Sequence, residues 1–440
     1  MTTNTREILL EMLLEILEHK KYSHLVMKQV LDKYAYLDKK DRAFIKRIGE
    51  GTIEHLIRID YVINTFSKTK TDKMKPVIRT ILRMSTYQIL FMEAVPDSAA
   101  CNEGVKLAVR KGFAPLKGFV NGVLRSISRN KGTISYPDRE ASLEEYLSIT
   151  YSMPLWIVKM WLADYGEETT ERVLKGLLQE RPVTIRIPEE LPEEEKQAWI
   201  SQMKKEGIAV EESNQLAYAY YLSNINSVRE VPGFAEGKLI VQDLGSMEVV
   251  EMAHIKEEDR VLDVCAAPGG KTLHAASKLK GTGMVEARDI SDYKIGLIRE
   301  NIERTGYKNI QTRVWDATNP DEAAFESADV VIADLPCSGL GVIGRKGDIK
   351  YRITKEDLTD IAALQRNILK TVSAYVKKGG LLIYSTCTIS REENQENRDY
   401  ILNHLPFVLE EEKVLLPGIE PSDGFYMARF CKKKEKAGVE

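Results

Sequence analysis

Strand-like and helix-like segments alternate from about residue 255 onward, and this alternation limits the possible folds more than any other feature of the sequence. The strand-like segments are short apolar runs, and amphipathic stretches separate them. Such alternation is typical of a parallel, doubly wound sheet, which binds ligands at the carboxyl ends of its strands. We therefore predict an α/β domain over residues 251–435. Its strands are predicted at RVLDVC, GMVEARD, IQTRVWD, ADVVIADLP and GGLLIYSTCT, with FYMARFCKK as an antiparallel edge strand.

The residues before this domain divide into two regions of different periodicity. Over residues 1–132, apolar residues recur at the helical spacing i, i+3, i+4 and i+7, and strand-like alternation is nearly absent. Residues 133–250 mix helical stretches with short alternating runs such as RPVTIRI and YAYYLSNI. The pattern predicts a multi-domain protein, with an all-α N-terminal bundle followed by a linker and a small α+β middle region.

The composition favours a globular protein of a reducing compartment. No apolar run approaches the roughly 20 residues that span a bilayer. The first residues lack the basic start and the cleavage site of a signal peptide. The five cysteines lie far apart and include no Cys-X-X-Cys pair, which argues against both a disulfide framework and a zinc site. We therefore expect a cytoplasmic protein without a bound metal and without a membrane partner. The composition leaves its oligomeric state open, and a monomer is the default expectation.

Charge is distributed unevenly along the chain. Residues 1–130 hold 23 Lys and Arg against 14 Asp and Glu, a net charge of +9. The remaining residues hold 40 and 52, a net charge of −12. A basic module joined to an acidic one indicates an N-terminal region that binds a polyanion, although unevenly charged, solvated helix faces would give the same count.

A glycine-containing turn follows the first predicted strand of the α/β domain, in VLDVCAAPGGKT. Gly269 and Gly270 allow a close approach of the backbone to a ligand, and the helix after them offers free N–H groups. The spacing around Lys271 differs from that of a P-loop. Asp289 ends the next strand, where a carboxylate accepts hydrogen bonds from a ribose diol. Asp316 ends the third strand, where it flanks an adenine or simply forms a turn.

Two cysteines follow the last two parallel strands. Cys337 comes after Asp334 in DLPCSGLG, and Cys387 lies in STCT. Because neighbouring parallel strands end at one edge of the sheet, we expect both thiols to converge on one crevice. A lone cysteine near a strand is usually a small core residue, but a pair at adjacent strand ends is harder to explain in that way.

Two thiols in a nucleotide-binding crevice suit methylation of cytosine at carbon 5. That carbon is a poor nucleophile until a thiolate adds to carbon 6 and makes carbon 5 enamine-like. A base must then remove the proton from carbon 5 so that the thiol can leave. The target base must be unstacked or single-stranded, because the reacting atoms lie in its plane.

The motifs DVCAAPGGKT, DLPCSGLG and STCT together resemble those of the RNA cytosine-5 methyltransferases. QDLGSMEVV and DGFYMARF resemble the flanking segments of the same family. The basic helical N-terminus, with YQILFM and FVNGVLR, resembles the RNA-binding fold of the antitermination factor NusB. This combination is similar to the RsmB branch, also called Sun or Fmu. The resemblance covers essentially the whole chain, and it implies a Rossmann-like class I methyltransferase domain that uses S-adenosyl-L-methionine.

The resemblance also implies a role for each candidate residue. Cys387 is expected to be the nucleophile, a choice between the two cysteines that the residues alone leave open. Cys337 is expected to assist release of the methylated RNA, and Asp334 to contact both the cytosine and the methyl donor. The residues expected to hold the donor are Cys265, Ala266, Ala267, Pro268, Gly269, Gly270, Lys271, Asp289, Asp316 and Asp334.

The substrate implied by the resemblance is cytosine 967 of 16S ribosomal RNA, methylated before the small subunit is fully assembled. A transfer RNA is an alternative substrate for the same chemistry. A non-catalytic RNA-binding assembly factor is an alternative from another class, which the two intact cysteines disfavour. A DNA methyltransferase is disfavoured because no large target-recognition insertion separates the motifs.

Overall fold

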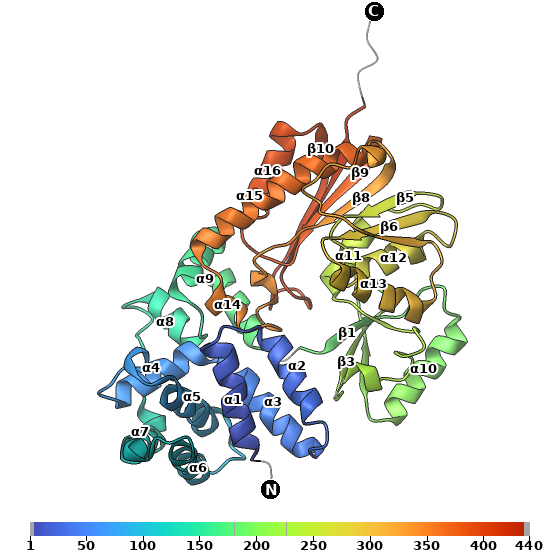
Figure 1. Ribbon diagram of the computed structural model, residues 1–440. Helices are drawn as coiled ribbons and strands as arrows, with labels where there is room; N and C mark the ends of the chain where they lie inside the picture. The colour runs from blue at the N-terminus through green and yellow to red at the C-terminus, as the bar shows by residue number, and fades with distance from the viewer. Residues whose placement is uncertain (1–3, 180, 226, 435–440) are drawn as a thin grey trace, which may run out of the picture. The chain divides into compact units, whose positions relative to one another are not determined.

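The computed structural model describes residues 4–179, 181–225 and 227–434, and the chain forms two compact units (Figure 1). One unit holds Met1–Leu178 together with Ile343–Ile353, and the other holds Gln179–Val342 and Thr354–Glu440. Residues 343–353 therefore belong to the first unit, although the residues on both sides of them in the sequence belong to the second. No helix within the described residues is long and apolar enough to cross a membrane.

The first unit is helical throughout its described residues, which confirms the all-α prediction for the N-terminal region. Buried side chains at helical spacing, such as Leu9, Leu13 and Ile16, contribute to one apolar cluster that joins the N-terminal helices. The helices are α1 (Thr5–Leu17), α2 (Ser23–Lys33), α3 (Lys39–Glu54), α4 (Leu56–Phe66), α5 (Pro76–Phe91), α6 (Asp97–Arg110), α7 (Lys117–Asn130), α8 (Leu143–Thr150), α9 (Leu155–Leu178) and α14 (Ile349–Arg352).

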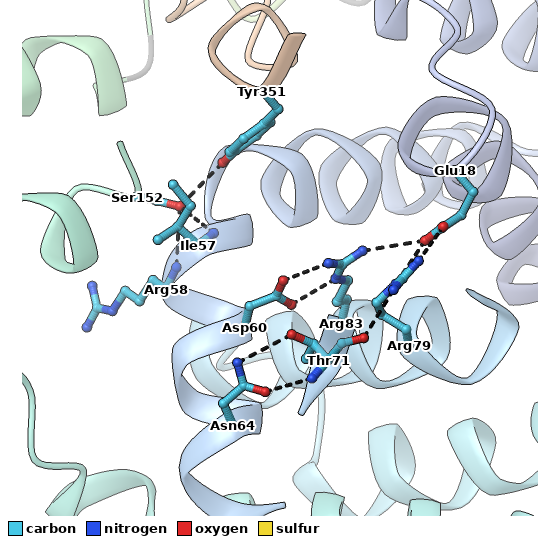
Figure 2. Close-up of polar contacts among 10 residues, drawn as sticks. All are labelled: Glu18, Ile57, Arg58, Asp60, Asn64, Thr71, Arg79, Arg83, Ser152 and Tyr351. Carbon is cyan, nitrogen blue, oxygen red and sulfur yellow. Dashed lines mark hydrogen bonds and ion pairs between the residues drawn. The ribbon is translucent and has the colours of Figure 1, made fainter. Parts of the chain in front are cut away.

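Two arginines of α5 connect the end of α1 to α4 through ion pairs (Figure 2). Arg79 donates from Nε to Oε1 of Glu18 at 3.0 Å, and Arg83 donates from Nη2 to Oδ2 of Asp60 at 2.6 Å. Arg83 also lies 3.6 Å from Glu18, so both guanidinium groups share that carboxylate. These side chains are largely shielded from water, where salt screens such pairs less than it does at the surface.

Residues 343–353 come from the second half of the chain, yet they pack among the N-terminal helices. Lys350 is only 2% exposed, and its Nζ donates to the main-chain oxygen of Glu54 at 2.8 Å. The hydroxyl of Tyr351 lies 3.4 Å from Oγ of Ser152, which in turn accepts hydrogen bonds from the backbone at the start of α4 (Figure 2). This segment is thus a structural part of the helical unit.

The second unit contains a small antiparallel sheet with the strand order β2-β3-β1-β4. Buried side chains from its strands and from α10 form a separate apolar cluster. The predicted runs RPVTIRI and YAYYLSNI contain β1 and β3, and the α+β middle region is confirmed. The elements are β1 (Val183–Arg186), α10 (Glu193–Lys205), β2 (Ala209–Glu212), β3 (Ala219–Ser223) and β4 (Ile240–Val241).

The second unit also contains a seven-stranded, mostly parallel sheet with the order β10-β11-β9-β8-β5-β6-β7. Apolar side chains of α11, α12 and α13 cover one face, and those of α15 and α16 cover the other. The chain runs outward from β5 to β7 and then returns to β8 on the other side of β5, so the strand order reverses between β5 and β8. The elements are α11 (Leu244–Met252), β5 (Arg260–Asp263), α12 (Gly270–Lys278), β6 (Met284–Asp289), α13 (Asp292–Thr305), β7 (Ile310–Val314), β8 (Ala328–Asp334), α15 (Lys355–Val372), β9 (Val376–Thr386), α16 (Gln395–His404), β10 (Phe407–Leu415) and β11 (Phe425–Lys432).

The predicted doubly wound sheet is confirmed, but its edge is not where the sequence placed it. The segment FYMARFCKK forms β11, which is antiparallel as predicted but lies between β9 and β10. The edge strand is β10, FVLEEEKVL, which the sequence analysis did not predict. Three consecutive glutamates conceal its alternation, and such charges are common on edge strands because they discourage pairing with another chain.

The buried Lys350 predicts that the stability of the helical unit depends on pH. Burial lowers the pKa of Lys350 to about 7, while the charge of Glu54 opposes the shift. Above pH 7 the unfolded chain keeps a proton that the folded chain has lost, so this group makes the folded state more stable as the pH rises toward 10. Lys350→Met abolishes this titration. We expect the melting temperature of Lys350→Met relative to wild type to fall by a few degrees between pH 6 and pH 9.

Differential scanning calorimetry of the full chain measures this difference. Lys346→Met is the matched control, because Lys346 is exposed and lies on the same segment. Its difference from wild type should stay constant over the same pH range. A constant difference for Lys350→Met as well would contradict the prediction.

Candidate active site

The turn between β5 and α12 presents backbone groups at the point where the strand order reverses. Gly269 has a φ of +106°, which favours glycine because a side chain is strained there. Its N–H donates to the carbonyl of Ala266 at 2.7 Å, which closes the turn. A Cβ atom added at Gly270 would be in ordinary contact with the side chain of Gln242, at 3.8 Å. The turn therefore has a conformation that can receive a ligand against the N-terminus of α12.

Asp289 lies at the end of β6 and is tied to this turn. It is 3% exposed, and its Oδ2 accepts the N–H of Ala267 at 3.0 Å. Lys294 approaches Oδ1 at 3.0 Å. Asp316 follows the neighbouring strand β7, but its Oδ1 accepts hydrogen bonds from the N–H and the hydroxyl of Thr318, at 2.9 and 2.7 Å. Asp316 thus forms a local turn, and a contact with adenine stays a prediction.

Asp263, the last residue of β5, is a buried carboxylate that the sequence analysis did not single out. Its Oδ2 accepts the hydroxyl of Thr272 at 2.7 Å, and its Oδ1 has no hydrogen-bond partner among the described residues. Burial raises its pKa to about 7, opposed by the bond from Thr272. A buried carboxylate oxygen without a donor is costly, and the raised pKa of Asp263 has the same physical cause. The sequence feature that could have identified Asp263 is its position as an acidic residue at the end of a buried strand.

An ion pair joins the two sides of the reversal point. Lys271, at the start of α12, places its Nζ 2.7 Å from Oδ2 of Asp334 at the end of β8. The other carboxylate oxygen of Asp334 accepts the hydroxyl of Ser385 at 2.9 Å. The Lys271 ammonium also lies 5.1 Å from the centre of the Phe425 ring. These contacts fix Asp334 in the crevice where the sequence placed it.

The two predicted cysteines lie side by side. The sulfur atoms of Cys337 and Cys387 are 3.3 Å apart, and both residues are partly exposed. The hydrogen bond with Cys387 and burial raise the pKa of Cys337 well above its usual value. Either sulfur can donate the hydrogen bond that joins the two thiols. Cys265, on the turn after β5, is partly exposed as a residue, and burial of its sulfur raises its pKa, so it remains a protonated thiol.

A buried carboxylate behind the cysteines holds their two loops together. Glu393 is fully buried, and its Oε2 accepts the N–H of Ser338 at 2.9 Å while its Oε1 accepts the hydroxyl of the same residue. That hydroxyl also lies 2.8 Å from the hydroxyl of Thr388, and Gln365 donates to Glu393 at 3.2 Å. Burial raises the pKa of Glu393, against the effect of these donors. Because Ser338 follows Cys337 and Thr388 follows Cys387, the network sets the spacing of the two thiols.

Comparisons with known proteins show which family this chain belongs to. Residues 250–431 match the model of the 16S rRNA methyltransferase RsmB/F family, residues 3–129 match the NusB family, and residues 153–229 match the ferredoxin-like domain of RsmF/B-like methyltransferases. A Bacillus subtilis protein named "Probable ribosomal RNA small subunit methyltransferase B" is 34% identical, and the match covers 98% of this chain and 99% of that protein. The chain belongs to the RsmB/F family. It is therefore an S-adenosylmethionine-dependent ribosomal RNA methyltransferase of the small-subunit class.

Other relatives and solved structures agree with this membership. The ribosomal RNA small subunit methyltransferase B of Klebsiella pneumoniae is 28% identical, over 90% of this chain and 91% of the relative. The crystal structure of PH0851 has a TM-score of 0.81 at 23% identity and covers 99% of this RsmB/F chain and all of that one. The structure of NSun6 from Pyrococcus horikoshii with SFG has a TM-score of 0.57 at 22% identity, over 63% of this chain and 97% of that one. At these identities the structures show a shared fold.

The structure brings most of the sequence-predicted residues of this RsmB/F chain to one end of the sheet. The turn 265–271 contacts Asp289 and Asp334, and Cys337 contacts Cys387. The sequence analysis missed Asp263 and Glu393. No local sequence pattern predicts the role of Glu393, because its partners Ser338 and Gln365 lie 55 and 28 residues away in the sequence.

The network behind the cysteines predicts a loss of turnover when Glu393 is changed. In Glu393→Ala the N–H and hydroxyl of Ser338 lose their acceptor, so the two cysteine loops lose a common anchor. We expect kcat for methyl transfer to fall about 10–100-fold, because a displacement of about 1 Å at a reacting group has an effect of this size. Affinity for S-adenosylmethionine should change less than about twofold. Glu393→Gln should lie between the two, because an amide has one acceptor oxygen rather than two.

Steady-state kinetics and equilibrium binding of S-adenosylmethionine separate these effects. Glu392→Gln is the matched control, because the neighbouring carboxylate bonds to Thr359 and lies outside the network. A folded Glu393→Ala variant with wild-type kcat would show that the carboxylate does not position the thiols.

Proposed function

We propose that this protein transfers a methyl group to carbon 5 of one cytosine in small-subunit ribosomal RNA, through a covalent bond between Cys387 and the base. The observation that carries the proposal is the pair of thiols 3.3 Å apart, on neighbouring strand ends beside the Lys271–Asp334 ion pair. A methyltransferase that acts on an exocyclic amine or a hydroxyl has no use for two such thiols. Carbon 5 chemistry needs one sulfur to attack and a further group to assist release.

The methyl donor would be held by the turn 265–271 together with Asp289, Asp316 and Asp334. The positive φ of Gly269 suits a close ligand, and the buried carboxylate of Asp289 suits a ribose diol. When bound, S-adenosylmethionine supplies an electrophilic methyl group on its sulfonium sulfur. The chain's own residues would hold this donor, orient the base and move the protons.

The covalent steps follow from the arrangement of the side chains. The sulfur of Cys387 adds to carbon 6, and the Asp334 carboxyl hydrogen-bonds N3 and the exocyclic amine, which favours addition. Carbon 5, now the nucleophilic carbon of an enamine, would form its bond to the methyl carbon as the bond between that carbon and the sulfonium sulfur breaks, which leaves a neutral thioether. A base removes the proton from carbon 5, the bond between sulfur and carbon 6 breaks, and the 5,6 double bond forms again. We assign assistance in this release to Cys337, whose protonated sulfur adjoins that of Cys387.

For the whole chain, we propose an RNA-binding domain over residues 1–132, a linker and middle region over 133–250 and the methyltransferase domain over 251–435. The net charge of +9 over the first 130 residues supports contact with RNA phosphates, which would make binding fall steeply with salt. The substrate we propose is cytosine 967 of 16S ribosomal RNA before the subunit is fully assembled, bound by a monomer in the cytoplasm.

Methyl transfer from labelled S-adenosylmethionine to protein-free small-subunit ribosomal RNA tests the proposal. We expect wild type to place the label in 5-methylcytidine and Cys387→Ala to lose activity at least about 10³-fold, because no sulfur remains to activate carbon 5. Cys337→Ala should accumulate a covalent protein–RNA adduct, visible as a slow band in a denaturing gel. Cys431→Ala is the control thiol variant, because Cys431 lies beside the carbonyl of Gly379, outside the donor turn and the cysteine pair.

Other outcomes would overturn different parts of the proposal. If the label appeared only in transfer RNA, the assignment of ribosomal RNA as the substrate would be wrong, and the proposed carbon 5 chemistry would still stand. Full activity in Cys387→Ala would refute the assigned nucleophile and make Cys337 the candidate. Binding of RNA without any transfer of label would favour the non-catalytic assembly factor.

A further inference from the structure

The helical unit contains a cavity of about 370 Å³ near the C-terminal end of α5. Its walls come from α4, from the end of α5 and the loop after it, and from the chain beyond α7. The residues that matter to the argument are Arg58, Phe91, Glu93, Asp97, Lys131 and Tyr136. The volume is in the range of pockets that hold small ligands.

Arg58 lies between two aromatic rings of this cavity. Its guanidinium carbon is 5.4 Å from the centre of the Phe91 ring and 4.8 Å from the centre of the Tyr136 ring. Its Nε donates to the hydroxyl of Tyr136 at 3.3 Å, while no described residue accepts a hydrogen bond from Nη1 or Nη2. Figure 2 shows the side chain pointing away from the ion pairs of α5. Two donor groups of this planar cation therefore have no hydrogen-bond partner among the residues that the structure describes.

Two further aromatic rings stack on the rings that flank this arginine. The His55 ring stacks on Phe91 at 4.3 Å with an angle of 12° between the planes, and the Tyr61 ring stacks on Tyr136 at 5.9 Å with an angle of 21°. Burial and the nearby positive charges lower the pKa of His55 to about 3, so its ring is neutral and apolar in character. The rings support Phe91 and Tyr136 from behind, so that the aromatic walls of the cavity have fixed orientations.

The charges of the cavity favour a base over a phosphate. Asp97 accepts a hydrogen bond from Lys131 at 3.0 Å, so this lysine is already paired. Glu93 adds a negative charge at the rim, where it would repel a free anion. The last carbonyl groups of α5 have no partner within the helix, and they offer acceptors for an amine. The cavity thus combines a forked cationic donor, acceptor oxygens and flat apolar walls.

We propose that this cavity binds one unpaired guanine base of the RNA substrate. Arginine donates two hydrogen bonds to O6 and N7 of guanine, while the carbonyls at the end of α5 accept from the guanine amine. Unpaired RNA bases commonly stack on aromatic rings, and Phe91 and Tyr136 provide such rings beside the arginine. Adenine lacks the O6 acceptor and would present an amine to the arginine. The inference rests on the proposed function, since it assumes an RNA substrate, and it adds a recognition site away from the reacting base.

Photocrosslinking tests the site directly on the full-length wild-type protein. Small-subunit ribosomal RNA carrying 6-thioguanosine would be irradiated with the protein, and the modified peptides identified by mass spectrometry. We expect an adduct on Tyr136 or Phe91 that 5′-GMP competes away and 5′-AMP does not. Crosslinks confined to other parts of the protein would refute the site. Competition by inorganic phosphate as strong as that by 5′-GMP would show an anion site instead.

A substitution test separates this site from the active site. Arg58→Lys retains the charge but removes the fork, so we expect KM for the RNA to rise about tenfold with kcat within about twofold of wild type. Arg129→Lys is the matched control, because Arg129 is an exposed arginine of the same unit and outside the cavity. If the wild-type protein is active and Arg58→Lys has an unchanged KM for the RNA, the proposed guanine site is refuted and the proposed function is not. Absence of methyl transfer to ribosomal RNA in wild type would instead show that the proposed function has failed.

Discussion

The reversal of strand order between β5 and β8 is the constraint on which the candidate site depends. Helices cannot cover the sheet continuously at that point, so backbone and side chains from both strands meet in a crevice. Asp263, Asp334 and the thiols of β8 and β9 all follow from this one topological feature. The Lys271–Asp334 ion pair spans the reversal point and joins the donor-side turn to the strand that precedes Cys337. Many nucleotide-binding sheets have their site at such a reversal point. In this chain, the residues at the strand ends determine the chemistry of the site.

The sequence predicted the parallel strands and the site around them because these depend on local patterns. A parallel strand that is buried on both faces is a continuous apolar run, and residues at the ends of neighbouring strands must converge. The sequence could not show β10, where Glu410, Glu411 and Glu412 hide the alternation, and it placed β11 at the edge. It missed Glu393 for another reason, since a buried carboxylate is explained only by donors that the fold brings from distant parts of the chain.

The segment 343–353 shows a further limit of local reasoning. GRKGDIKYRI has the composition of an exposed loop, yet Lys350 is buried and bonds to the end of α3. The segment begins six residues after Cys337, so the loop that carries this thiol is continuous with a part of the helical unit. A sequence window that covers only the methyltransferase motifs would place these residues in the wrong unit. Their burial depends on the N-terminal helices, and no periodicity within the segment itself reveals it.

The two thiols lie so close together that the charge of each one depends on the other. Cys337 precedes Ser338, which Glu393 and Thr388 hold in a buried network, and its raised pKa keeps it protonated. A protonated neighbour at 3.3 Å stabilises negative charge on the sulfur of Cys387 and holds a proton that the leaving step can use. Two equally ionised thiolates at this distance would repel each other. Only one of the two sulfur atoms can therefore carry a negative charge at a time, and the proposed roles give that charge to Cys387 and the proton to Cys337.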